Sequence, residues 1–244
     1  TILEREAILD AIKEALVGQF GLKILCAIAY GSALNEDFSY NSDFDILIVA
    51  RDPNIQFLEK LREIKLDWLR NGIKVDFNVH NETDVPSIRK ELFWHNNRGI
   101  YVQKELELYG KVLIGKNIFR IENIDIGQIL AEAVRVINSL NYQARKTLIN
   151  TDLKDSDKIL LMKWCIYGSL YALASRGIFP SDRKSALKKF YEVFEPPINP
   201  EKFLHIKVNR PDEINHEDLE IAYDFLTYLD KKIFEDYESF KSDH

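Results

Sequence analysis

Residues 31–45 read GSALNEDFSYNSDFD and join two apolar segments, 22–30 and 46–50. We expect both apolar segments to be buried strands, with a polar loop between them. Asp43 and Asp45 stand at the entry to the second strand, two residues apart. Side chains alternate along a strand, so the two carboxylates point to the same side, roughly 6.5–7 Å apart. At this spacing two carboxylates can share hard divalent cations.

The Gly-Ser pair at the start of the stretch has the chemistry to contact a phosphate. Gly31 lets the backbone come close to a ligand, and Ser32 offers both a hydroxyl and an amide. Ser42, next to Asp43, is a further candidate for nucleotide binding. An Asp-x-Asp at a strand start is also common on solvated edges. The strand and Gly-Ser that precede it favour a site for a metal-bound polyphosphate.

A third acid, Asp76, stands in a segment of alternating character. Residues 75, 77 and 79 are apolar, whereas residues 74, 76 and 78 are polar, which predicts a strand with one polar face. An ordinary amphipathic strand gives the same pattern, so Asp76 alone does not indicate a site. If this strand neighbours the strand of Asp43 and Asp45, the three acids converge on one surface.

These residues resemble the motif of the nucleotidyltransferase superfamily, which includes DNA polymerase beta and the aminoglycoside nucleotidyltransferases. The motif is a Gly-Ser, a spacer, an Asp-x-Asp on a strand and a third acid on a later strand. The matching residues are Gly31, Ser32, Asp43, Asp45 and Asp76. The resemblance implies transfer of a nucleoside monophosphate, AMP in our reading, from a nucleoside triphosphate to a hydroxyl, with release of pyrophosphate.

The same resemblance assigns a role to each matching residue. Asp43 and Asp45 hold two Mg²⁺ ions, and Asp76 binds the ion on the acceptor side or takes the acceptor proton. Gly31 and Ser32 cradle the β and γ phosphates.

Composition bounds the remaining possibilities. A chain of 244 residues with 46% hydrophobic residues can bury a core, and no apolar run approaches the ~20 residues of a membrane span. The first residues show an acidic, amphipathic pattern that is unlike a signal peptide, so we expect a cytoplasmic protein with no membrane partner. The net charge of −6 disfavours nucleic acid as a partner.

The periodicity of the chain predicts an α+β protein in two parts. The first, residues 1–118, is a nucleotidyltransferase-type mixed sheet with flanking helices; the second, residues 119–244, is a helical bundle. In the first part we expect helices at 3–20 and 58–68, a helix start at 84–87 with a break at 94–99, and strands at 22–30, 43–50, 72–79 and 107–115. In the second we expect helices at 126–148, 157–175, 181–194 and 216–234.

The second part resembles the four-helix domains that accompany small nucleotidyltransferase domains, including the HEPN group. Residues 163–173 and 177–180 carry this likeness. HEPN ribonucleases use an Arg followed by a His, and residues 183–187 contain no His, so we expect no ribonuclease activity. The cluster of basic residues around Lys184 is an ordinary solvated helix face, or else supplies a cation to the triphosphate.

Three functions remain open at this point. The first is a nucleotidyltransferase that acts on a small hydroxyl-bearing acceptor, and the second modifies a protein or belongs to a toxin–antitoxin pair. The third is a non-catalytic nucleotide-binding regulator, which the three intact acids disfavour. Residue patterns leave open the acceptor, the base of the nucleotide and the oligomeric state, for which a homodimer is one possibility.

Overall fold

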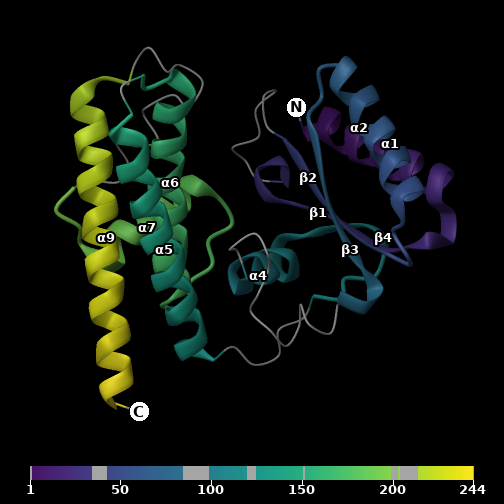
Figure 1. The fold of residues 1–244 in the computed structure, drawn as a ribbon. Helices are drawn as coiled ribbons and strands as arrows, with labels where there is room; N and C mark the ends of the chain where they lie inside the picture. The colour runs from purple at the N-terminus through teal and green to yellow at the C-terminus, as the bar shows by residue number, and fades with distance from the viewer. Residues whose placement is uncertain are drawn as a thin grey trace. The chain divides into compact units, whose positions relative to one another are not determined.

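The computed structural model describes residues 2–34, 43–84, 99–119, 125–150, 152–198, 203 and 214–243. Contacts divide the chain into two units, Thr1–Glu122 and Asn123–His244. The first contains a sheet with helices, and the second consists of helices in its described residues (Figure 1). The predicted fold class, a mixed sheet with flanking helices followed by a helical region, is confirmed.

The sheet of the first unit is mixed. Its described strands lie in the order β3-β2-β1-β4, and they are β1 (Ile24–Tyr30), β2 (Phe44–Ala50), β3 (Val75–Asn81) and β4 (Lys111–Gly115). Strand β1 is antiparallel to both β2 and β4, whereas β2 and β3 are parallel. A parallel pair needs a crossover, which is helix α2 (Ile55–Arg70), and β3 is left at an edge of the sheet.

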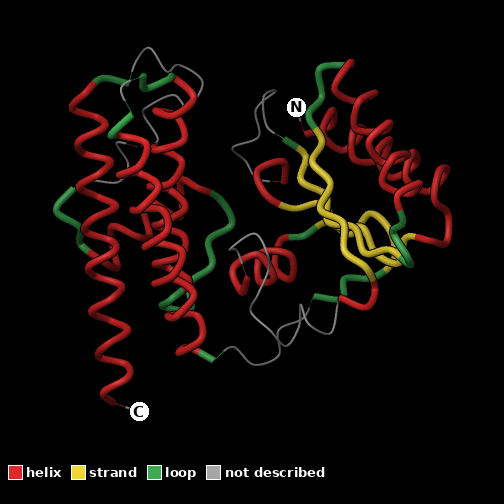
Figure 2. The backbone as a smooth tube through the Cα atoms, in the orientation of Figure 1, coloured by secondary structure: helices red, strands yellow, loops and turns green. Residues whose placement is uncertain are grey.

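Helices cover both faces of this sheet (Figure 2). Helix α1 (Ile2–Phe20) and α2 pack on one face, because alternate residues of β1 and β2 form one buried cluster with Leu9, Ile12 and Leu16 of α1 and Phe57 and Leu61 of α2. Helix α4 (Gly99–Tyr109) packs on the other face through Val102 and Leu106. Strands β1 and β2 are therefore apolar on both faces, which explains their continuous apolar sequence.

Short 3₁₀ turns complete the described part of the first unit. They are η1 (Gly21–Lys23), η2 (Gly31–Leu34) and η3 (Glu82–Asp84). The helix start that we predicted at 84–87 and the break at 94–99 fall largely on residues 85–98, which lie outside the described part of the chain.

Two predicted boundaries differ from the observed ones by four residues or more. The strand expected from residue 107 begins at Lys111, because the helical period of Val102 and Leu106 continues through Tyr109. The last helix, α9 (His216–Asp243), runs nine residues past its predicted end at residue 234. Tyr237 and Phe240 continue the helical period of Ile233 through its final turns, and the exposed side of these turns carries i,i+3 pairs such as Lys241–Glu238 (3.4 Å).

The second unit packs helices around aromatic side chains. The described helices are α5 (Ile126–Leu148), α6 (Asp155–Ala174), α7 (Arg183–Phe194) and α9. Phe225 of α9 is fully buried, with its ring 5.5 Å from Phe190 and 5.0 Å from Phe203. Side chains also cap the helices: Asp125 accepts a hydrogen bond from the Gly127 amide at the start of α5.

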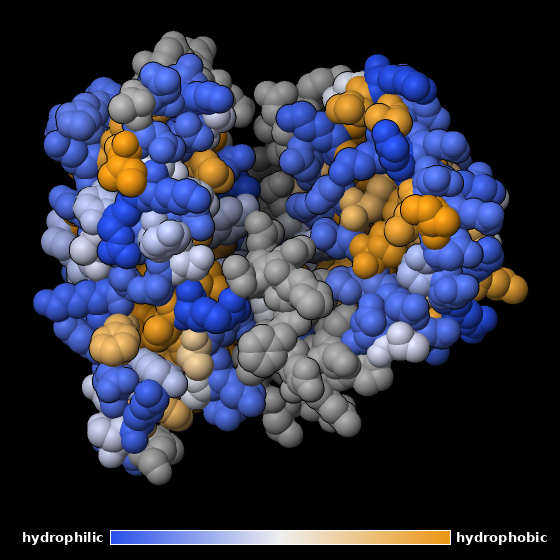
Figure 3. Space-filling view, viewed as in Figure 1, coloured by the Kyte–Doolittle hydropathy of each residue, from blue (hydrophilic) through white to orange (hydrophobic). Residues whose placement is uncertain are grey.

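The face drawn in Figure 3 is mainly hydrophilic on both units, with apolar side chains in several patches among the polar ones. Among the described residues, we find no helix that is both long enough and apolar enough to cross a membrane. Cys26 and Cys165 are free and buried, and burial raises the pKa of the Cys26 thiol to about 11. Neither thiol is placed to act as a nucleophile near neutral pH.

We expect Phe225→Ala to lower the free energy of unfolding by about 3–5 kcal/mol, because it removes a fully buried ring and leaves a cavity. Urea denaturation followed by circular dichroism measures this change. The matched control is Phe234→Ala on the same helix, whose ring is 52% exposed and whose loss should cost less than about 0.5 kcal/mol. Equal losses in the two variants would contradict the described core.

Candidate functional site

Asp45 and Asp76 are direct neighbours on adjacent strands. In the parallel β2–β3 pair, Asp45 stands opposite Asp76. Phe44 and Val75, the residues before them, both belong to the buried cluster under α1 and α2. Because strand side chains alternate, Asp45 and Asp76 both point to the opposite face. The strands lie about 4.8 Å apart, so the two carboxylates share one patch at the edge of the sheet.

Gly31 lies against this patch, at a position where only a residue without a side chain fits well. It follows Tyr30, which pairs with Asp45 across the β1–β2 ladder. Its φ is +77°, a conformation that favours glycine, and a Cβ there would lie 2.8 Å from Oδ2 of Asp45. The glycine of the motif is therefore required both by its own backbone and by the neighbouring carboxylate.

The other predicted residues of the motif are placed less completely. Asp43 is exposed and directly precedes β2. Ser32 belongs to η2, but its side chain is outside the described part of the structure, and Ser42 is not among the described residues. The structure thus brings Gly31, Asp45 and Asp76 together, with Asp43 two residues away along the chain.

The donor set suits a hard divalent cation, since it offers carboxylate oxygens beside a glycine with no side chain to block them. In the described ranges, however, no three His, Cys, Asp or Glu side chains are arranged closely enough to hold one metal ion. Among the described residues, the candidate site therefore consists of a pair of adjacent acids, Asp45 and Asp76.

Two polar contacts at this patch were not expected from the sequence. Lys65 of α2 donates a hydrogen bond to Oδ1 of Asp76 at 2.6 Å. Asn78 of β3 donates to the hydroxyl of Tyr30 at 2.8 Å. The second bond joins β1 to β3 across β2, on the face that carries Asp45 and Asp76. It holds the edge strand from the side of the acids.

No local signal in the sequence marks these contacts. Lys65 has the helical spacing of its neighbours, and it is separated from Asp76 by 11 residues and a turn. Tyr30 and Asn78 are 48 residues apart, and each looks like an ordinary strand residue. Only the order of the strands brings these pairs together.

Comparison with known families decides what kind of domain this is. Residues 9–96, which include Gly31, Asp45 and Asp76, match the family described as "Nucleotidyltransferase domain". The first unit of this chain contains a nucleotidyltransferase domain. A domain of this kind indicates a transferase enzyme, as we expected from the motif.

A solved structure has a similar fold over most of the chain. It is spectinomycin adenyltransferase AAD(9) from Enterococcus faecialis, solved with ATP and spectinomycin. The TM-score is 0.54 at 13% sequence identity, and the match covers 91% of this chain and 96% of that one. At this identity the likeness concerns the fold. No curated protein matches this chain in sequence.

Lys184, the predicted cation for the triphosphate, lies outside the nucleotidyltransferase domain. It is exposed in the first turn of α7, in the second unit. That turn is capped by Asp182, whose side chain accepts hydrogen bonds from the amide and hydroxyl of Ser185. Partial burial acts to raise the pKa of the Asp182 carboxyl, but the hydrogen bonds outweigh it and leave this pKa below its ordinary value. The role of Lys184 remains a prediction.

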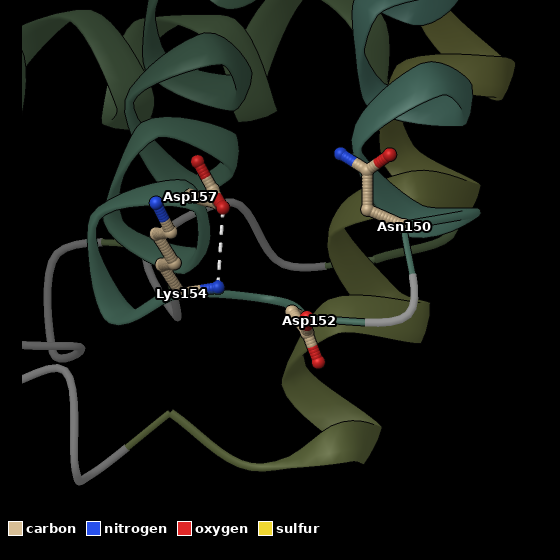
Figure 4. A pocket seen from close by; sticks show the side chains of 4 residues that line it. All are labelled: Asn150, Asp152, Lys154 and Asp157. Atoms are coloured by element: carbon tan, nitrogen blue, oxygen red, sulfur yellow. Dashed lines mark hydrogen bonds between the residues drawn. The ribbon is translucent and has the colours of Figure 1, made fainter.

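A polar hollow in the second unit has a structural explanation. It is lined by Asn150, Asp152, Lys154 and Asp157, where α5 gives way to α6 (Figure 4). The Lys154 amide donates to the Asp157 carboxylate at 3.1 Å, as in a capping box. Asp157 therefore serves the start of α6, and none of the predicted site residues lines this hollow.

Replacing Gly31 should damage the nucleotidyltransferase site specifically. Gly31→Ala forces a side chain into a conformation that costs about 1–2 kcal/mol and pushes on the Asp45 carboxylate. We expect at least about tenfold weaker binding of Mg-ATP by calorimetric titration, since 1.4 kcal/mol corresponds to a factor of ten.

The control is Gly18→Ala in helix α1, where an added Cβ meets nothing within 4 Å. This variant should be neutral or slightly more stable, because alanine favours a helix. Unchanged Mg-ATP affinity in Gly31→Ala would show that this glycine does not shape the site.

Proposed function

We propose that this enzyme transfers AMP from ATP to a hydroxyl of a small-molecule acceptor and releases pyrophosphate. The observation that carries the proposal is the placement of Gly31, Asp45 and Asp76 on one patch of a nucleotidyltransferase domain. The choice of donor and acceptor is supported by AAD(9), which has a similar fold and was solved with ATP and spectinomycin.

In this proposal the acids of the patch hold Mg²⁺. Asp43 and Asp45 bind the ions that accompany the triphosphate, and Asp76 faces the acceptor. When bound, the cations neutralise the charge of the phosphates and lower the cost of bringing an attacking oxygen close to them. Gly31 and Ser32 provide the close backbone approach and the donors for the terminal phosphates, with Ser42 and Lys184 as further contacts.

The chemical step needs positioning and one proton acceptor. The acceptor hydroxyl oxygen attacks the α-phosphorus, and the bond from that phosphorus to the pyrophosphate oxygen breaks. Asp76 stands on the strand next to Asp45, so a hydroxyl held above both can pass its proton to Asp76 while the nucleotide lies toward Asp45. Catalysis then comes mostly from orientation and charge compensation.

Incubation with α-labelled ATP tests the proposal. The purified protein is given Mg²⁺ and either a panel of aminoglycosides and spectinomycin or a cell lysate, and products are separated into small molecules and proteins. Label on a small acceptor supports the proposal. Label on proteins alone would instead show a protein-modifying enzyme, and ATP binding without any transfer would show a regulator.

Asp45→Asn and Asp43→Asn should each lower nucleotidyl transfer by about 10²–10³-fold, because each removes an anionic ligand and keeps the shape of the side chain. Mg-ATP affinity by titration should weaken as well. The control is Asp67→Asn, an exposed acid on α2 that pairs with Arg70. Full activity in either site variant would exclude these acids from cation binding.

Asp76→Asn should lower kcat by about 10²–10⁴-fold while leaving Mg-nucleotide affinity nearly unchanged. A group that acts on the acceptor contributes mainly in the transition state, so its loss reduces kcat more than nucleotide binding. Measurement of kcat and of the nucleotide Kd in this variant separates the two effects. A change in kcat of less than about twofold would assign Asp76 to an ordinary exposed strand face.

A further inference from the structure

Lys65 reaches the acid pair from the far side of the sheet. Helix α2 packs through Phe57 and Leu61 on the face opposite to Asp45 and Asp76. Among the described strands β3 lies at the edge of the sheet, so a long side chain on α2 can pass around it. The ammonium of Lys65 ends 2.6 Å from Oδ1 of Asp76.

Stability alone is a weak reason for this contact. The side chains of Lys65 and Asp76 are 47% and 52% exposed, and ion pairs this exposed add little to the stability of a fold. The charges nearby give a stronger reason. Asp76 stands directly opposite Asp45, and two like charges in this position repel each other.

We infer that Lys65 is a built-in counter-ion that competes with a divalent cation for the Asp45–Asp76 pair. Lys65 is thus a positioning residue that acts through Asp76. This inference rests on the proposed function, because it concerns the ion on the acceptor side, which Asp45 and Asp76 would share and which contributes little to the affinity for the Mg-nucleotide.

Two features make Lys65 a competitor rather than a helper. Its hydrogen bond uses one of the two oxygens of Asp76, so that a cation is left with the other oxygen or must displace the ammonium. The ammonium also stays within a few ångströms of any cation bound there and repels it. Lys65 therefore neutralises part of the charge of the pair when no cation is bound, and it raises the concentration of cation needed to fill the site.

The test is the affinity of the nucleotide-free, full-length protein for Mn²⁺ alone, measured by electron paramagnetic resonance. We expect Lys65→Met to bind Mn²⁺ more tightly than wild type, by about three- to tenfold, from the repulsion between charges roughly 5 Å apart in a water-like medium. Lys65→Arg keeps the charge and should behave as wild type. In turnover, Lys65→Met should reach half-maximal rate at a lower Mg²⁺ concentration.

Matched variants separate this role from a structural one. Lys60→Met removes the same charge from the exposed side of α2 and should leave Mn²⁺ affinity unchanged. Asp76→Asn should remove the gain given by Lys65→Met when the two are combined. If Lys65 only clamps β3 in place, Lys65→Met will bind Mn²⁺ equally or more weakly, and that result would overturn the inference.

The proposed function has its own outcome in the same experiment. Asp45→Asn should abolish Mn²⁺ binding at this site in every background. If it does so while Lys65→Met equals wild type, the inference about Lys65 fails and the proposed function stands. If no variant shows binding that depends on Asp45, both fail.

Discussion

The parallel pairing of β2 with β3 is the constraint on which the candidate site depends. It sets Asp45 opposite Asp76, although both are acids and their direct opposition costs free energy. The register is held by the apolar residues next to the acids, because Phe44 and Val75 must both enter the cluster under α1 and α2. A slip of one residue on either strand would turn one acid into that cluster. The hydrophobic core therefore holds two like charges side by side.

The compensation for this arrangement comes from elements that lie far away in the sequence. Lys65 supplies a positive charge from the crossover helix, and Asn78 ties β3 to Tyr30 across the sheet. Because Gly31 has no side chain, the Asp45 carboxylate can lie directly beside the backbone of the turn. A patch of negative charge that is held in place and partly neutralised is suited to receive a cation that brings phosphates with it.

The parts of the site that could be predicted from sequence are those encoded locally. Gly31 and the Asp43–Asp45 spacing can be recognised in the sequence, because a backbone turn and a two-residue period depend only on neighbouring residues. The contacts of Lys65 and Tyr30 could not be predicted, since they depend on the strand order and on β3 lying at an edge. The boundary between α4 and β4 was misjudged for a related reason: residues 107–109 suit either element, and burial of Leu106 decides for the helix. The identity of the acceptor cannot be predicted from the fold, because one fold supports many substrates.

The most direct test of the account is the position of the metal and nucleotide in crystals grown with Mn²⁺ and a non-hydrolysable ATP analogue. Anomalous diffraction locates each Mn²⁺ independently of the protein atoms. We expect an ion bound by a carboxylate oxygen of Asp45, about 2.1 Å away, with the phosphates of the analogue beside Gly31. Phosphates and ions bound elsewhere, with Asp76 still paired only to Lys65 and the face of Asp45 empty, would contradict it.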